Sequence, residues 1–261
     1  MTDSLASCLM KGARLLGLSL DRDRAGLFLR YLEVLQRERQ NLTAVTSPRE
    51  VLEKHFLDSL AVATVAPLEP GFSVLDVGSG AGFPGVPLKI LVPGIRLTLL
   101  EPRARRAFFL ENLATALSLD GVVVCRQRAE DFLRVPGNRE RFLLVTARAV
   151  APLAVLAEYC LPAVTVGGRW VACKGPEAAR EVAAAAGALD LLGGRLVRVR
   201  DLVLPFSRAV RNLVVVEKAR PTPDAFPRPA GVPARRPLGV SGPAGKKAKD
   251  GEYKGHEGGG W

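Results

Sequence analysis

A glycine-rich turn is the segment of this sequence whose residue types and spacing are best suited to binding a small molecule. Apolar residues 74–75 run into Asp76, and glycines follow at positions 78, 80 and 82. Because glycine carries no Cβ and adopts positive φ angles readily, the backbone of such a turn can approach a ligand closely. We therefore expect a cofactor above this turn, at the carboxyl end of the strand that precedes it.

Two classes of cofactor fit this turn. Residues 80–85 match the dinucleotide pattern G-x-G-x-x-G, with the acidic Glu101 about 20 residues farther on. S-adenosylmethionine sites instead have an acidic residue two positions before the first glycine, as Asp76 stands before Gly78, with its carboxylate near the methionine amino group. The dinucleotide register would extend the strand to Gly78 and bury Asp76 without a partner, which is costly. The sequence therefore favours S-adenosylmethionine over a nicotinamide or flavin.

Further candidate ligands stand where the next strands end. Glu101 ends the second predicted strand, a position suited to a carboxylate that accepts both ribose hydroxyls. After the third strand, Ala129 and Glu130 offer a small side chain and a carboxylate that would read an adenine amino group. After the fourth strand, Arg148 supplies five donors for a base edge, a phosphate or the cofactor carboxylate. This last turn lacks the usual signatures of exocyclic-amine and cytosine-carbon methylation, so a target that needs no deprotonation, such as guanine N7, is compatible with it.

Seven strands that alternate with helices are needed to position these residues. Short β-branched runs recur after residue 72 and predict a mostly parallel sheet. Residues 205–211 are too few for a crossover helix, so the last two strands should pair antiparallel at one edge. This α/β outline is that of a Rossmann-like class I S-adenosylmethionine-dependent methyltransferase, although a generic doubly wound fold explains most of it too. The predicted strands cover residues 74–77, 96–101, 122–127, 143–147, 169–174, 196–204 and 212–217.

Composition divides the chain into three segments. Residues 1–70 are electrically neutral and contain helical patterns over 5–16, 21–40 and 48–65, which predict an N-terminal helical extension. Residues 71–218 hold the predicted sheet and have an excess of basic residues. Residues 219–261 are basic and rich in proline and glycine, which predicts a mostly extended or disordered tail that forms no packed element.

The overall composition limits the classes of partner. The formal net charge is +11, which indicates either a polyanionic partner such as nucleic acid or a solvated arginine-rich surface. Four widely spaced cysteines and two histidines predict no metal site, and reduced thiols suit a cytoplasmic protein. Since no apolar run approaches the roughly 20 residues of a membrane span, we expect no membrane association by a spanning helix.

Several short motifs together make this sequence similar to the bacterial 16S rRNA guanine-N7 methyltransferases, the glucose-inhibited division protein B family. The resemblance covers roughly residues 32–238. It implies a cytoplasmic enzyme, expected to be a monomer, that methylates N7 of one guanine in small-subunit rRNA or in the 30S subunit, with S-adenosylmethionine and without a metal. The motifs that carry it are Asn41-Leu42-Thr43, His55-Phe56-Leu57-Asp58-Ser59-Leu60, residues 76–87, Arg148-Ala149-Val150, Lys174-Gly175 and Arg211-Asn212-Leu213-Val214.

The resemblance also implies roles for individual residues, and these overlap with the positions chosen from the turn and the strand ends. Arg148 is in addition the candidate contributor to catalysis, and no general base is evident. Pro102 departs from the small or polar residues that family members often have at this position. The expected cofactor contacts are Asp76, Gly78, Gly80, Phe83, Glu101, Pro102, Arg103, Ala129, Glu130 and Arg148.

Basic residues near the later strands and in the tail are expected to face RNA. They are Lys174 after the fifth strand, Arg211 before the seventh, and Arg235 and Arg236 in a C-terminal basic segment. His55 and Asp58 stand three residues apart on one helical face, and we expect them to form a pair that holds the helical extension to the sheet. The chain beyond residue 239 lies outside the resemblance.

Two other functions remain open. One is methylation of another RNA, and the other is a non-catalytic cofactor-binding module that binds RNA during ribosome assembly. A small-molecule substrate is disfavoured because it would not account for the positive charge of the tail. Methyl transfer followed by analysis of the labelled nucleoside distinguishes these possibilities.

Overall fold

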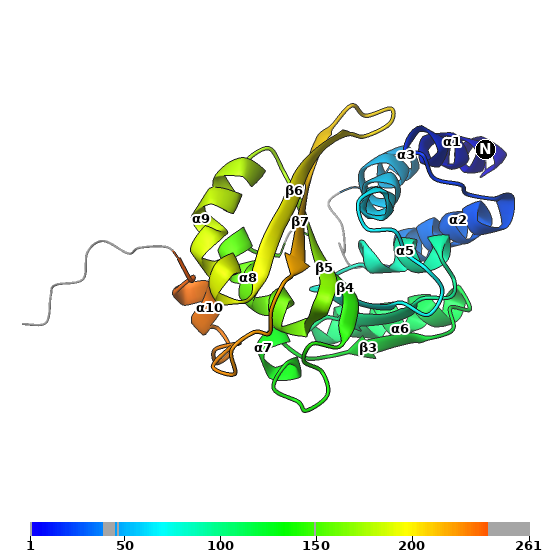
Figure 1. Ribbon diagram of the computed structural model, residues 1–261. Coiled ribbons are helices and arrows are strands. Elements are labelled where there is room, and N and C mark those ends of the chain that lie inside the picture. Colours follow the sequence, from blue (N-terminus) through cyan, green and yellow to red (C-terminus); the bar gives the residue numbers. More distant parts are fainter. Residues whose placement is uncertain (1, 39–44, 46, 149, 240–261) are drawn as a thin grey trace, which may run out of the picture.

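The computed structural model describes residues 2–38, 45, 47–148 and 150–239. Its centre is a seven-stranded sheet of order β3-β2-β1-β4-β5-β7-β6 (Figure 1). Strands β1 to β5 are parallel, and β7 runs antiparallel to both of its neighbours. The predicted fold class is thus confirmed. The strands are β1 (Ser73–Val77), β2 (Arg96–Leu100), β3 (Val122–Cys125), β4 (Phe142–Arg148), β5 (Val164–Lys174), β6 (Gly194–Val203) and β7 (Val210–Lys218).

The sheet separates two hydrophobic cores. Along β7, Leu213 and Val215 belong to one core, whereas Val214 and Val216 belong to the other. This alternation is the period of two that a strand imposes on its side chains. A strand buried on both faces therefore reads as a continuous apolar run, as residues 213–216 do.

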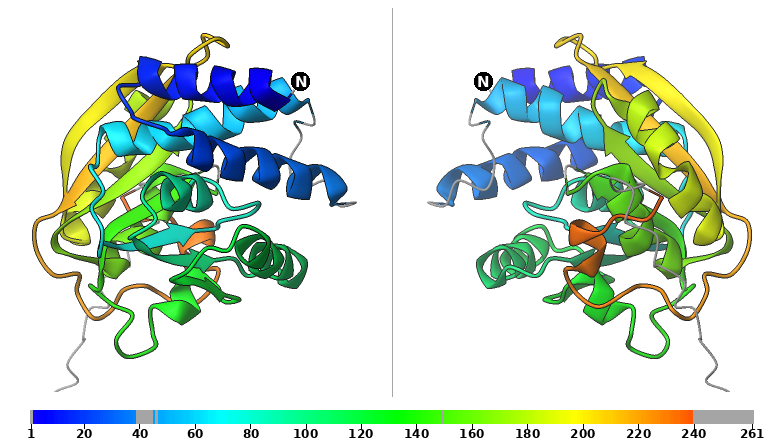
Figure 2. Two further views of the ribbon diagram at one scale, coloured as in Figure 1. Left: turned by 90° about the vertical axis from the view of Figure 1, so that its right-hand side faces the viewer. Right: turned by 90° about the vertical axis from the view of Figure 1, so that its left-hand side faces the viewer.

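The N-terminal helices pack on one face of the sheet and share its first core (Figure 2). Asp21 caps α2, because its Oδ1 accepts a hydrogen bond from the Arg24 backbone N–H at 2.8 Å. The helix expected over 48–65 is a continuous helical run that contains a π-helical turn, η1. The elements are α1 (Thr2–Leu15), α2 (Arg22–Arg37), α3 (Pro48–Val51), η1 (Leu52–Leu57), α4 (Asp58–Leu60) and η2 (Ala61–Thr64).

The helices that follow the strands cover both faces. Helices α5 (Gly85–Leu91) and α6 (Ala104–Ala116) contribute to the same core as the N-terminal helices. Helices α7 (Ala129–Phe132), α8 (Leu153–Cys160) and α9 (Ala178–Leu191), together with the short 3₁₀ segment η3 (Leu161–Ala163), contribute to the other core. The three-layer arrangement brings the carboxyl ends of β1 to β5 to one edge.

The tail is packed over residues 219–239, so the expectation that it forms no packed element is wrong for this part. Phe226 and Leu238 lie against the second core, and the guanidinium of Arg139 donates to the backbone oxygens of Thr222 and Phe226. Proline and glycine prevent long regular elements here, but scattered apolar side chains still anchor the chain. One short helix forms in this segment, α10 (Val232–Arg235). The lysine cluster at 246–249 lies outside the described residues.

No helix in the described part of the chain has the length and apolar character required to cross a membrane. The same part contains no group of three or more His, Cys, Asp or Glu side chains arranged to hold a metal ion.

Candidate functional site

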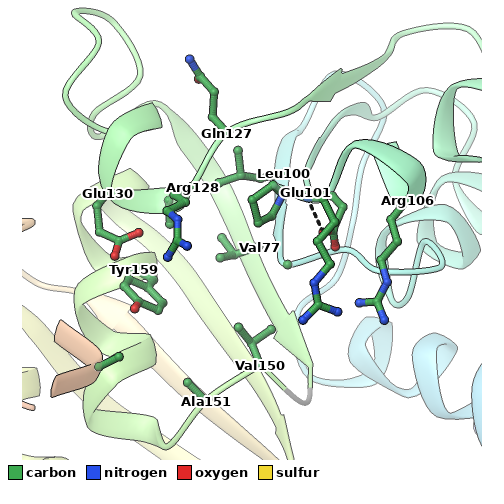
Figure 3. Close-up of a pocket in the computed structure, with 15 residues that line it drawn as sticks. Val77, Leu100, Glu101, Arg106, Gln127, Arg128, Glu130, Val150, Ala151 and Tyr159 are labelled. Carbon is green, nitrogen blue, oxygen red and sulfur yellow. Dashed lines mark hydrogen bonds between the residues drawn. The ribbon is translucent and has the colours of Figure 1, made fainter. Parts of the chain in front are cut away.

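A cavity of about 520 Å³ opens at the carboxyl ends of β1, β2 and β3 (Figure 3). It lies between the glycine-rich turn, the start of α6, the start of α7 and helix α8. The sequence-predicted residues Gly78, Glu101, Pro102, Arg103, Ala129 and Glu130 all line it. The remaining lining residues are Val77, Leu100, Arg106, Gln127, Arg128, Val150, Ala151, Tyr159 and Ala234.

The glycine-rich turn forms the wall of the cavity that follows β1. Gly78 and Gly80 have φ angles of 71° and 59°, which disfavour side chains with a Cβ. A Cβ on Gly78 would also lie only 2.7 Å from Cγ2 of Val150, so this position requires glycine for packing as well as for its φ angle.

Glu101 connects the turn after β1 with the loop after β2. Its Oε2 accepts from the Gly80 backbone N–H at 3.0 Å, and its Oε1 accepts from the Arg103 N–H at 2.9 Å (Figure 3). Each carboxylate oxygen can accept more than one hydrogen bond, so both retain capacity for a ligand. The carboxylate is therefore held in a fixed orientation at the cavity, with acceptor capacity left.

Glu130 and Tyr159 form the opposite side of the cavity. Burial, and then the nearby Glu130 carboxylate, raise the pKa of Tyr159 to about 12, so its hydroxyl stays protonated. Glu130 itself is fixed by the backbone N–H of Gly231, which donates to Oε1 at 2.9 Å. Tyr159 and Ala234 were not predicted to line a site, because an aromatic residue in an apolar helix and an alanine in a proline-rich tail carry no ligand-binding signature.

Asp76, which was predicted to contact the cofactor, does not line the cavity. Its side chain is fully buried behind the turn, where Oδ2 accepts from the Gly85 N–H at 3.1 Å and Oδ1 accepts from the Thr146 hydroxyl at 3.0 Å. Burial raises the pKa of Asp76 to about 6. Contrary to expectation, the buried Asp76 has partners, which the start of α5 and β4 provide.

Arg148 and Phe83 were predicted to contact the cofactor, and neither lines the cavity. Arg148 leaves the end of β4 toward the N-terminal helices, where Nη2 donates to the Lys54 carbonyl at 3.0 Å and to Nδ1 of His55 at 2.7 Å. Its Nη1 lies 3.3 Å from Oδ2 of Asp58. Phe83 stacks on His55 with the ring centroids 4.9 Å apart, and the Arg148 guanidinium lies over the Phe83 ring.

We call Arg148, His55, Asp58, Phe83 and Arg211 the junction, because they join the N-terminal helices to the sheet. His55 and Asp58 hold the helices there as expected, but each does so through Arg148 rather than through a bond to the other. Desolvation, followed by the positive charge of Arg148, lowers the pKa of His55 to about 4. The neutral ring accepts the Arg148 proton at Nδ1 and carries its own proton on Nε2.

The four cations predicted to face RNA divide into two groups. Lys174 Nζ donates to the Ala151 carbonyl and to Glu181 Oε2, both at 2.7 Å, and Arg211 Nε lies 3.3 Å from Oδ2 of the buried Asp58. These two are therefore occupied by internal partners. Arg235 and Arg236, at the end of α10, are exposed to solvent as an RNA contact requires.

The strand order, the antiparallel β7 and the cavity at the glycine-rich turn define the class I methyltransferase fold. A solved structure of a mutant of MtNAS shares this fold, with a TM-score of 0.51 and 18% sequence identity over 84% of this chain and 87% of that chain. The chain belongs to the GidB family, described as rRNA small subunit methyltransferase G, whose family model matches residues 25–214.

Curated relatives match most of the chain and most of their own length. The ribosomal RNA small subunit methyltransferase G of Symbiobacterium thermophilum is 50% identical over 88% of this chain and 96% of that protein. The protein of the same name from Pelotomaculum thermopropionicum is 47% identical over 90% of this chain and 99% of its own length. The resemblance stated from the short motifs is confirmed.

Proposed function

We propose that this protein transfers a methyl group from S-adenosylmethionine to N7 of a guanine in small-subunit 16S rRNA. The names of its relatives support an rRNA substrate. The observation that carries the cofactor assignment is the arrangement around Glu101, whose carboxylate is fixed by N–H groups from the turn after β1 and the loop after β2. This arrangement would place carboxylate oxygens that can bind the ribose beside the glycine-rich turn.

The cavity residues would hold different parts of the cofactor. Glu101 would accept the ribose hydroxyls, and Ala129 with Glu130 would bind the adenine ring and its amino group. Arg103 and Arg106 line the cavity near Glu101, as Figure 3 shows for Arg106, and would bind the methionine carboxylate. When bound, S-adenosylmethionine supplies a methyl group activated by its attachment to a positively charged sulfur.

Guanine N7 suits a site of this kind because it requires no proton removal. The N7 lone pair forms the new bond to the methyl carbon, and the electrons of the broken carbon–sulfur bond stay on sulfur. No proton moves, and the positive charge passes to the purine. The protein would therefore act by aligning N7 with the methyl carbon, and such alignment can lower a reaction barrier by several kcal/mol. Hydrogen bonds to Glu101 and Glu130 fix the geometry without either group serving as a base.

The RNA partner is expected to bind through exposed cations. The net charge of +11 supports a polyanionic substrate, and Arg235 and Arg236 are exposed on a segment that reaches the cavity. We place the protein in the cytoplasm, acting as a monomer on 16S rRNA or on the 30S subunit.

Transfer of labelled methyl from S-adenosylmethionine to purified small subunits and to naked rRNA, followed by nucleoside analysis, tests the proposal. Label in 7-methylguanosine is the expected result, and the preferred substrate identifies the assembly stage. Label in another nucleoside would reject the target atom. Cofactor binding without transfer would favour the non-catalytic module.

A further inference from the structure

Residues 226–238 of the tail extend to the cavity, and we call this segment the strap. It lies outside the part of the chain that the family model matches, residues 25–214. In Figure 1 it is the orange segment that carries α10. Its Ala234 is exposed and lines the cavity together with Tyr159 and Glu130. A segment distant from the sheet in the sequence thus supplies part of the cavity wall.

A buried ion pair fastens the strap to helix α8. Arg228 donates from Nε and Nη2 to the two carboxylate oxygens of Glu158, at 3.1 Å and 2.6 Å to Oε2 and 2.9 Å to Oε1. The Arg228 backbone N–H also donates to Oε1 at 2.7 Å. Glu158 is fully buried, so the strap must remain in place for this charge to keep its partner.

The strap also fixes a carboxylate at the cavity. Gly231 has a φ of 79°, and its N–H donates to Oε1 of Glu130 at 2.9 Å. Glu130 is only 3% exposed and lines the cavity. The strap therefore fixes one oxygen of the Glu130 carboxylate before any ligand arrives.

We propose that the strap is part of the binding site for the adenosine portion of the cofactor, with Ala234 as wall and with Arg228 and Gly231 as positioning residues for Glu130. This inference rests on the proposed use of S-adenosylmethionine. It assigns to the tail a role in cofactor affinity in addition to any contact of its arginines with RNA.

Calorimetric titration with S-adenosylhomocysteine tests the wall. Ala234→Phe adds a ring at an exposed, cavity-lining position, so we expect at least a tenfold increase in Kd with an unchanged melting temperature. Ala230→Phe is the matched control, because Ala230 is exposed on the same segment but does not line the cavity. Equal Kd values for wild type and Ala234→Phe would overturn the strap proposal.

A second pair of variants tests the positioning role. Arg228→Met removes the anchor, and we expect a several-fold higher Kd in protein that still melts cooperatively. Arg220→Met, in the same tail, removes an exposed ion pair with Asp190 that lies away from the cavity, and should leave the Kd unchanged. An unchanged Kd in Arg228→Met would overturn this role. If the wild-type protein does not bind S-adenosylhomocysteine, the proposed use of S-adenosylmethionine is rejected. If the wild-type protein and the variants all bind it equally well, only the role of the strap is rejected.

Discussion

The cavity and the junction both contain arginine, acidic and aromatic side chains, but they use them differently. At the cavity, Arg103 and Arg106 both line the open space, and Figure 3 shows the Arg106 side chain there. At the junction, the Arg148 side chain is only 16% exposed and is surrounded by Asp58, His55 and a backbone carbonyl. The cavity therefore retains hydrogen-bonding groups for a ligand, whereas at the junction the Arg148 guanidinium donates to groups of the protein itself.

The difference teaches that a cation after a strand is not by itself a ligand-binding group. Arg103 lies just after β2 and Arg148 is the last residue of β4, and both were expected to contact the cofactor. Their roles differ because the N-terminal helices present a carboxylate and an imidazole to Arg148 but not to Arg103. Loss of a junction residue should therefore reduce stability, and loss of a cavity residue should reduce binding.

The largest effect is expected for Arg148→Met at the junction. Arg148 and Arg211 both pair with Oδ2 of the buried Asp58, and Oδ1 has no hydrogen-bond partner within the described residues. Without Arg148, the carboxylate would therefore retain only Arg211 as its ion-pair partner. We expect a loss of about 3 kcal/mol in the free energy of unfolding, measured by urea denaturation. Arg128→Met, at an exposed cavity residue, is the control and should unfold like wild type. A fully stable Arg148→Met with impaired cofactor binding would reverse the two assignments.

His55 should make the junction sensitive to acid. The folded-state pKa of about 4 lies below the ordinary value of 6.5, so the unfolded chain binds the proton more readily between these values. Stability is therefore retained above pH 6.5 and lost as the pH falls toward 4, by on the order of 2 kcal/mol. His55→Asn keeps an acceptor for Arg148 without this titration. We expect the melting temperatures of His55→Asn and of the wild-type protein, measured from pH 4.5 to 7.5, to approach each other toward pH 4.5. A difference in melting temperature that is the same at every pH would contradict the prediction.

Glu101→Gln should affect binding more than stability. An amide keeps one acceptor oxygen but replaces the other with a donor that faces a backbone N–H and the ribose. We expect roughly a tenfold higher Kd for S-adenosylhomocysteine, about 1.4 kcal/mol, measured by calorimetry. Glu111→Gln, on the exposed face of α6, is the matched control. An unaltered affinity in Glu101→Gln would remove this carboxylate from the ribose site.

The smallest effect concerns the predicted RNA-facing cations. Replacing both Arg235 and Arg236 with alanine should reduce the slope of log affinity against log salt by about 1.5, because two phosphate contacts are lost. Lys174→Met should leave that slope unchanged, since Lys174 is already paired with Glu181. Filter binding to 16S rRNA over a range of salt concentrations measures both. A reduced slope only in Lys174→Met would show that the internally paired lysine is the one that contacts RNA.

Most of the fold was predictable because its signals are local. Each predicted strand overlaps an observed one, and the short connection before β7 correctly indicated antiparallel pairing. The strand limits were less accurate: β5 begins at Val164, five residues earlier than expected, because Val164 pairs with Phe142 of β4 across a register shift. The packing of the tail was missed because its anchors, Phe226 and Leu238, are isolated in a proline-rich sequence.

The sequence by itself determined the order of the strands along the chain, the glycine-rich turn and the carboxylate that ends β2, because backbone freedom and the alternation of side chains depend on nearby residues. Only the tertiary structure decided which polar groups remain available to a ligand. Arg148, Lys174 and Arg211 have partners that lie from 7 to 153 positions away in the chain. The strap adds Ala234 to the cavity for the same reason, since contacts between distant segments form only when the chain is folded.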